Sequence, residues 1–182
     1  DYATDWLVKS VHLRAKTASD YESILRVHLV PAFGAVALNR LRATHATSLI
    51  VAMRSTGYQD STLNKVLRLA NTVLNAAVTE QRLPTNPFAA VRKPPETRRD
   101  LVVLSPGEFS HLLAMIHPHF RCFSFAAVVL GLRFGELAGL RPSNLDLGRR
   151  RIFVVEQLTK GPGGPSRGPL KTAASKRSVS IP

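Results

Sequence analysis

Closely spaced prolines divide this chain into two parts that must fold separately. Pro84, Pro87, Pro94 and Pro95 follow one another within a short stretch, and a Thr-Arg-Arg-Asp segment comes next. Proline fixes its φ angle and donates no backbone hydrogen bond, so this density prevents both a helix and a central strand. We therefore predict an N-terminal domain over residues 1–83, a basic linker over residues 84–101 and a second domain over residues 102–182.

The first part has the apolar periodicity of helices. Helices are predicted from residue 2, from Thr17, from residue 44 and from Ser61, and the last carries a long apolar stripe that starts at Leu63. Apolar residues that recur every three or four positions place one face of each helix in a core. We expect a compact four-helix domain in which Thr17 and Ser61 act as helix N-caps.

The second part begins with helices and then changes to strands. Ser105-Pro106-Gly107-Glu108 has the residue types of a complete helix start, and residues 120–130 are apolar nearly all round, which predicts a buried helix. Residues 151–155 and 178–181 have strand character, and Gly161 to Gly168 is predicted to be a flexible loop. The chain as a whole is expected to be mainly α, with a small antiparallel sheet near its end.

The charge of the chain indicates a polyanionic partner. It has 25 Lys and Arg against 12 Asp and Glu, a net charge of +13, and basic residues recur along both parts. Lys and Arg in excess release condensed counterions when they meet phosphates. A hydrophobic content of 45% excludes wholesale disorder. No apolar run reaches the roughly 18 residues of a membrane span and no secretory signal opens the chain, so we expect a cytoplasmic protein without a membrane partner.

Two segments carry the motif with the most specific chemistry. One runs from Gly131 to Asp146 and contains Arg133 and Glu136; the other runs from Leu170 to Pro182 and contains Lys171. Together with the helical first part, they make the chain resemble the tyrosine recombinase (phage integrase) family over essentially its whole length. The resemblance implies a SAM-like four-helix core-binding domain, followed by the N-terminal, α+β part of a catalytic domain with a small antiparallel sheet.

The resemblance also implies the reaction and its residues. Members of the family cleave and rejoin DNA through a 3′-phosphotyrosine, without a metal or other cofactor. Arg133 would grip the scissile phosphate, because its planar guanidinium stays charged and can contact two oxygens. Lys171 would act as the general acid to the leaving 5′ oxygen or contact the minor groove, with Lys160 as the rival lysine. Glu136 lies one helical turn after Arg133 and would orient it.

The family pattern continues with a His-x-x-Arg segment and a nucleophilic tyrosine, which do not occur here. Tyr2, Tyr21 and Tyr58 all lie in the first part. We therefore expect a chain truncated from a bacterial or phage-encoded parent, able to bind double-stranded DNA but not to cut it. The full-length parent is expected to act as a homo-tetramer on DNA. A non-catalytic DNA-binding protein derived from an integrase, and a basic RNA-binding or structural protein, are the alternatives.

Phosphate contacts are expected from helix starts and basic side chains. The candidates are Thr17, Ser19, Ser61, Thr62, Lys65, Arg68, Lys93 and Arg177, with Arg92, Arg98 and Arg99 of the predicted linker beside them.

Neither the histidines nor the lone cysteine indicates a metal site. His111, His117 and His119 are close in sequence, but no Cys or acidic ligand flanks them at the usual spacing. Cys122 lies in the apolar segment 120–130, which predicts a buried core thiol.

Overall fold

The computed structural model describes residues 1–95, 100–161 and 163–182. Its contacts divide the chain into two compact units, Asp1–Arg99 and Asp100–Pro182, which we call the helical unit and the sheet unit. The predominance of helix and the small antiparallel sheet confirm the predicted fold class.

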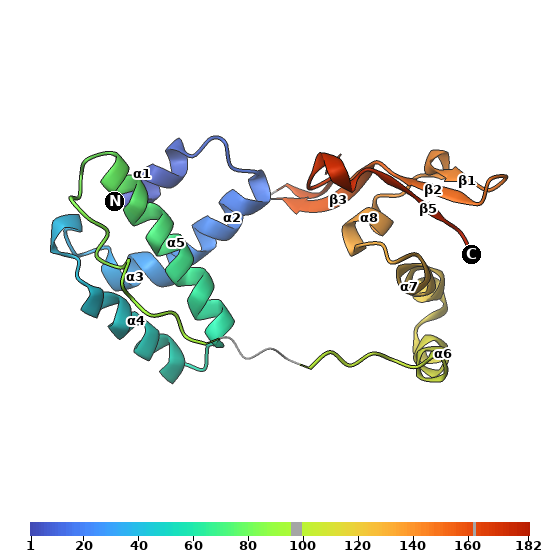
Figure 1. Cartoon of the computed structure of the whole chain (residues 1–182), viewed down its shortest axis with the longest axis horizontal. Helices are drawn as coiled ribbons and strands as arrows, with labels where there is room; N and C mark the ends of the chain where they lie inside the picture. The colour runs from blue at the N-terminus through green and yellow to red at the C-terminus, as the bar shows by residue number, and fades with distance from the viewer. Residues whose placement is uncertain (96–99, 162) are drawn as a thin grey trace. The chain divides into compact units, whose positions relative to one another are not determined.

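Helices make up the helical unit, and the longest of them organises it. Helix α5 contacts both α2 and α4 (Figure 1). The elements are α1 (Tyr2–Lys9), α2 (Ala15–Ile24), a π-helical turn η1 (Leu25–Leu29), α3 (Val30–Phe33), a 3₁₀ turn η2 (Leu38–Arg40), α4 (Ala43–Ser55) and α5 (Asp60–Thr79).

The core of this unit lies along the predicted stripe of α5. Leu63, Val66, Leu74 and Ala77 are all buried, together with intervening apolar residues of the same face. Full burial of a Leu or Val side chain contributes about 1.5–3 kcal/mol, so this one face supplies much of the driving force for folding the unit. The predicted periodicity of this helix is confirmed.

The predicted N-caps are wrong for two helices. Helix α2 begins two residues before Thr17, and α5 begins one residue before Ser61, so both side chains lie inside the first turn. In α5, Asp60 takes the first helical position, where a carboxylate interacts favourably with the helix dipole. In α2, an ion pair of 2.6 Å between Lys16 and Asp20 supports the first turn. These local interactions extend each helix beyond the residue with the better capping side chain.

The proline-rich segment packs on the helical unit as far as Pro94. Leu83 and Phe88 belong to the buried core. The side-chain amide of Asn64 donates a 2.9 Å hydrogen bond to the carbonyl of Pro94. The division between the compact units, at residues 99 and 100, falls within the predicted linker of residues 84–101, and the first part of that linker belongs to the helical unit. Prolines exclude regular structure from this segment, but they do not prevent its apolar side chains from joining a core. Arg98 and Arg99 lie outside the described residues.

The sheet unit combines three helices with two small antiparallel sheets. Strands β1, β2 and β5 form one sheet in that order, and β3 pairs with β4 in a hairpin. The elements are α6 (Pro106–Met115), α7 (Pro118–Leu130), α8 (Phe134–Ala138), η3 (Pro142–Asn144), β1 (Leu145–Asp146), β2 (Arg151–Val154), β3 (Glu156–Gly161), β4 (Gly164–Pro169), η4 (Ala173–Ser175) and β5 (Arg177–Ser180).

The predicted helix start at Ser105 is confirmed. The Ser105 hydroxyl accepts a hydrogen bond from the backbone N–H of Glu108 at 3.3 Å, and the Glu108 carboxylate accepts one from the N–H of Ser105 at 2.8 Å. This is the reciprocal capping box that the sequence indicates.

The stretch from Gly161 to Gly168 is not the predicted flexible loop. It forms the end of β3 and most of β4, with Thr159 opposite Ser166 and Leu158 opposite Arg167. Glycine at the turn makes this possible, because Gly164 has φ near +97°, a conformation that other residues rarely adopt. Strand pairing up to Gly161 and Gly164 therefore replaces most of the predicted loop, while Pro162 lies outside the described residues.

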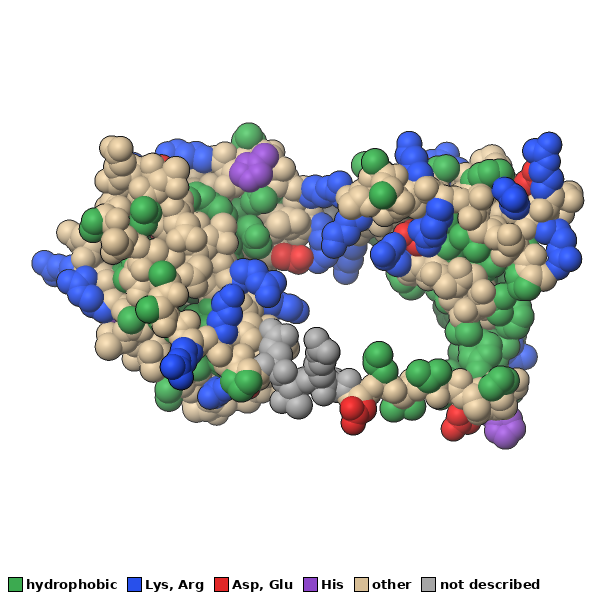
Figure 2. All heavy atoms as spheres, viewed as in Figure 1, with side chains coloured by type: hydrophobic (Ala, Val, Ile, Leu, Met, Phe, Trp, Pro, Cys, Tyr) green, Lys and Arg blue, Asp and Glu red, His purple; other side chains and the backbone are tan. Residues whose placement is uncertain are grey.

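The predicted burial of residues 120–130 is wrong for one side of α7. Phe123 and Ala127 pack on the small core of the sheet unit, but Phe120, Phe125 and Val128 are exposed. Hydrophobic side chains gather over α6 and α7 in Figure 2. Cys122 is also exposed, so the predicted core thiol is wrong as well. The helix is apolar all round, but its unit supplies packing partners for one side only.

Two glycines let α8 lie directly against the backbone of β3 (Figure 1). A Cβ atom on Gly135 would lie 2.7 Å from the carbonyl oxygen of Leu158, and one on Gly139 would lie 2.9 Å from the backbone nitrogen of Leu158. Side-chain carbons do not approach backbone atoms so closely, so a larger residue fits only if the strand moves. This contact fixes the helix that carries Glu136.

We expect the substitution Gly135→Ala to lower the free energy of unfolding of the sheet unit by about 1–3 kcal/mol, because the added methyl group overpacks a contact between backbones. Urea denaturation followed by far-ultraviolet circular dichroism measures the change. Gly107→Ala is the matched control, since its added methyl group meets open space in α6. Equal losses in the two variants would contradict the proposed close contact.

Candidate phosphate-binding site

Arg133 and Glu136 are held together at the start of α8. Arg133 is the N-cap residue, and its backbone N–H donates a 3.0 Å hydrogen bond to Oε2 of Glu136. Its guanidinium Nη1 donates a second bond of 3.0 Å to Oε1. The three-residue spacing of a capping box thus brings the carboxylate of Glu136 into contact with both the backbone and the side chain of Arg133.

Arg177 reaches the same carboxylate from β5. Its Nη2 donates to Oε2 of Glu136 at 2.8 Å, and its Nη1 donates to Oε1 at 3.2 Å. The same Nη1 donates to the backbone carbonyl of Ser175 at 3.2 Å. Two guanidinium groups from segments distant in sequence therefore share one carboxylate.

The carboxylate of Glu136 is buried and ionised. Its side chain is 2% exposed. Hydrogen bonds from Arg177, and then from Arg133, lower its pKa from the usual 4.5 to about 2, against the opposing effect of burial. The same contact raises the pKa of Arg177 above its usual value. The cluster therefore carries two positive charges and one negative charge at neutral pH.

The two arginines differ in their access to solvent. The Arg133 side chain is 73% exposed, whereas that of Arg177 is 33% exposed. Arg133 contacts Glu136 through one terminal nitrogen, so most of its five N–H groups are directed elsewhere. Arg133 is therefore the more accessible of the two to an incoming anion.

Both arginines line a polar surface hollow of about 480 Å³. Thr172 and Ser175 also line it, and their hydroxyl groups form a hydrogen bond of 2.8 Å with each other. Gly131, which follows the end of α7 and has φ near +60°, also lines the hollow. Guanidinium and hydroxyl donors around an open hollow are the groups that bind phosphate oxygens.

Lys171 is exposed, and it directly precedes Thr172, which lines the hollow. Its rival Lys160 lies on β3, opposite Pro165 of β4. Of the predicted site residues, the structure thus brings Arg133, Glu136 and Arg177 together, and Lys171 is the sequence neighbour of Thr172, which lines the hollow.

Sequence reasoning placed Arg177 among the DNA contacts and missed its bonds to Glu136. No local signal reveals a pairing across 41 positions. The hydroxyls of Thr172 and Ser175 were also missed as site residues, although both belong to the Leu170–Pro182 motif.

The remaining candidate contacts lie on the helical unit. Ser61, Lys65 and Arg68 are exposed and fall on one face of α5, while Thr62 is half-buried. Among the described residues, no carboxylate lies within 4 Å of Lys65 or Arg68. Both are therefore available to phosphates.

Three further candidates lie elsewhere on this unit. Lys93 is exposed and precedes Pro94, which Asn64 of α5 holds. Thr17 and Ser19 are half-buried within α2. Thr17 is the third residue of α2 and Ser19 is the fifth, so both lie near the start of this helix.

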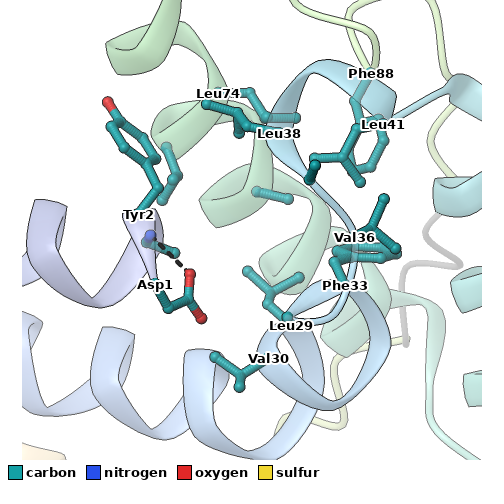
Figure 3. A pocket seen from close by; sticks show the side chains of 15 residues that line it. Asp1, Tyr2, Leu29, Val30, Phe33, Val36, Leu38, Leu41, Leu74 and Phe88 are labelled. Carbon is teal, nitrogen blue, oxygen red and sulfur yellow. Dashed lines mark hydrogen bonds between the residues drawn. The ribbon is translucent and has the colours of Figure 1, made fainter. Parts of the chain in front are cut away.

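A second cavity, of about 280 Å³, lies within the helical unit and is of a different kind. Figure 3 shows its walls, which include Leu29, Phe33, Leu74 and Phe88. Apolar walls of this kind offer few donors to a phosphate, so this cavity does not compete with the hollow as a candidate site.

Residues 1–95, 100–161 and 163–182 contain neither a candidate membrane-spanning helix nor a candidate metal-binding group. No helix there is long and apolar enough to cross a membrane. No three His, Cys, Asp or Glu side chains in these ranges are grouped so that they could hold a metal ion.

The depressed pKa of Glu136 predicts a specific acid sensitivity. Protonation is harder in the folded than in the unfolded state, so the stabilisation is complete above pH 4.5 and is lost as the pH falls towards 2. The loss over this window is expected to be on the order of 3 kcal/mol. Urea unfolding at a series of pH values measures it in the parent and in Glu136→Gln. If the two stability curves run parallel from pH 4.5 to pH 2, the buried carboxylate is not the group responsible.

Comparisons with known proteins give a consistent result. No model of a protein family matches the sequence. The chain is 27% identical to the integrase of Mycobacterium phage L5 over its whole length, and 26% identical over 87% of its length to the ICEBs1 integrase of Bacillus subtilis. It covers 48% and 44% of these relatives, so it spans about half their length.

Solved structures share the fold. The Tn1549 transposon integrase in complex with a circular intermediate DNA superposes with a TM-score of 0.87 at 19% identity, over the whole of this chain and 60% of the other. A lambda integrase dimer bound to a COC′ core site gives 0.75 at 17% identity, over the whole of this chain and 58% of the other. The solved structures show the shared fold and the curated relatives support the resemblance: the chain is related to the integrases of the tyrosine recombinase family.

Proposed function

We propose that this chain is the DNA-binding part of a site-specific tyrosine recombinase, an integrase that cleaves and rejoins DNA strands through a 3′-phosphotyrosine. The observation that carries the proposal is the exposed guanidinium of Arg133, held by the buried Glu136 at the edge of a polar hollow. Support comes from the integrase relatives, from the structural neighbours bound to DNA and from the net charge of +13.

In this proposal Arg133 binds the scissile phosphate. Strand cleavage builds negative charge on the phosphate oxygens, and a preorganised guanidinium stabilises that charge without rearranging. Arg133 is preorganised because both its backbone and its side chain are bonded to Glu136. Thr172 and Ser175 line the same hollow, and their hydroxyl groups are proposed as further donors to this phosphate.

Glu136 orients Arg133 and takes no part in proton transfer. A group with a pKa of about 2 is ionised at neutral pH and has no proton to give, and its weak basicity makes it a poor acceptor. Lys171 is the proposed general acid to the leaving 5′ oxygen, or a minor-groove contact beside the cut. Its position next to the hollow supports either role.

We propose that these 182 residues bind duplex DNA without cutting it. The proposed nucleophile is a tyrosine, and Tyr2, Tyr21 and Tyr58 all belong to the helical unit rather than to the unit of Arg133. Cleavage is assigned to the full-length parent, acting as a homo-tetramer on DNA in the cytoplasm of a bacterium. A non-catalytic DNA-binding protein would use the same contacts, but the relatives are named integrases, which favours the enzyme.

The helical unit is proposed to contact the DNA backbone through α5. Ser61, Lys65 and Arg68 share its exposed face, and Lys93 adds a further positive charge on the same unit. Thr17, Ser19 and Thr62 are half-buried and are proposed as secondary contacts. Phosphate contacts of this kind fix the position of the protein on the duplex and do not read sequence.

Substitution of Arg133 tests the proposed phosphate site. Arg133→Ala is expected to weaken binding to a fluorescent duplex by roughly tenfold, as expected for the loss of a charge-assisted contact. Fluorescence anisotropy at a fixed salt concentration measures the affinity. Arg149→Ala is the matched control, because it removes the same charge from an exposed arginine beside Asp146. Equal weakening in both variants would mean that overall charge, rather than the hollow, drives binding.

The salt dependence of binding tests the α5 surface. Lys65→Ala combined with Arg68→Ala is expected to reduce the slope of log affinity against log salt by roughly two, because each phosphate contact releases about one counterion. The control combines Lys16→Ala with Arg82→Ala, which removes two charges already paired with Asp20 and Glu80. An unchanged slope in the α5 variant would exclude this face as a DNA contact.

A further inference from the structure

Glu136 accepts two hydrogen bonds from each arginine, but the two guanidinium groups contact it differently, because one of the bonds from Arg133 comes from its backbone N–H. Arg177 uses both terminal nitrogens to contact both carboxylate oxygens, at 2.8 and 3.2 Å. Arg133 uses one side-chain nitrogen, at 3.0 Å, and remains largely exposed. The two-point contact to the more buried partner is the stronger ion pair, because bidentate geometry and partial desolvation both strengthen it.

The charges of the cluster give this asymmetry a consequence. One carboxylate balances one guanidinium. With Arg177 bound at two points, the negative charge of Glu136 is taken up within the sheet unit, and the positive charge of Arg133 is left for an anion in the hollow. Without Arg177, Glu136 would form its ion pair with Arg133 alone and would cancel the charge that attracts the phosphate.

The backbone holds Arg177 in place for this contact. It lies on β5 opposite Val154, which is fully buried in β2. Its Nη1 also donates to the carbonyl of Ser175, whose hydroxyl lines the hollow. The strand pairing and this extra bond set the guanidinium against Glu136 rather than towards solvent.

We propose that Arg177 is a positioning residue that neutralises Glu136 and thereby keeps the charge of Arg133 available to phosphate. This inference rests on the proposed function, because it takes duplex DNA as the source of the phosphate. It differs from a direct DNA contact by Arg177, since Arg177 acts here through Glu136 and Arg133.

A double-mutant cycle distinguishes the two roles. We expect Arg177→Gln to weaken binding of the full 182-residue chain to a fluorescent duplex by roughly tenfold. Adding Glu136→Gln to this variant is expected to restore most of the affinity, because no carboxylate then remains to cancel the charge of Arg133. A direct contact predicts instead that the double variant binds no better than Arg177→Gln.

Arg149 supplies the matched control for net charge. Arg149→Gln combined with Glu136→Gln makes the same change in total charge as the rescuing pair, but Arg149 is paired with Asp146 and not with Glu136. The effects of the two control substitutions are therefore expected to add. Rescue of equal size in the control pair would overturn the inference, because it would reflect total charge alone.

Arg177→Lys provides a second test that does not depend on removing the charge. The single ammonium group of lysine cannot make the two-point contact of the guanidinium group. The titration midpoint of the Glu136 carboxyl group, followed by carbon-13 NMR, is therefore expected to rise, and the affinity for DNA is expected to fall. A midpoint that stays unchanged would contradict the assigned role. This test also applies if Arg177→Gln unfolds the sheet unit.

Failure of the inference is separable from failure of the proposed function. If the parent chain does not bind the duplex, the proposed function is wrong. If the parent binds and Arg133→Ala weakens binding, but Glu136→Gln does not rescue Arg177→Gln, the proposed function stands and the role of Arg177 is wrong.

Discussion

The candidate site depends on the ion pairs that the buried carboxylate of Glu136 forms with Arg133 and Arg177. A carboxylate removed from water is tolerated only when charged partners and hydrogen bonds compensate it, and Glu136 has two guanidinium partners and a backbone N–H. Because these donors come from the start of α8 and from β5, the carboxylate ties together two segments that are 41 residues apart. The position and the free charge of Arg133 follow from that one group.

Close packing of backbones gives this cluster its rigid support. Gly135 and Gly139 allow α8 to lie against β3. Beyond the end of α8, Arg141 forms an ion pair with Glu156 of β3, to which Arg167 of β4 also lies close. The helix that carries Glu136 is therefore held to the β3–β4 hairpin by steric fit and by charge. A phosphate site built in this way is preorganised, because its charged groups need little rearrangement when an anion arrives.

Sequence patterns predicted best where a single element decides its own structure. The apolar stripe from Leu63 to Ala77 and the capping box at Ser105 depend on residues close together in the chain, and both are observed. The caps at Thr17 and Ser61 failed because neighbouring charges extended the helices. The prediction that α7 is buried was wrong for one side of the helix. An apolar surface favours burial, but the rest of the sheet unit determines how many side chains are there to pack against it.

The sequence by itself determined the mainly helical fold class, the presence of two units, the basic character of the chain and the placement of Glu136 one turn after Arg133. These features follow from composition and from short-range periodicity. The tertiary structure alone decided that residues 84–95 join the helical unit, that Gly161 to Gly168 pairs into a hairpin and that Arg177 binds Glu136. The first and third of these contacts join segments whose approach is set by how whole elements pack, which no local pattern of residues encodes. The hairpin is local, but its glycines and prolines are equally typical of a loop, so only the structure showed the strand pairing.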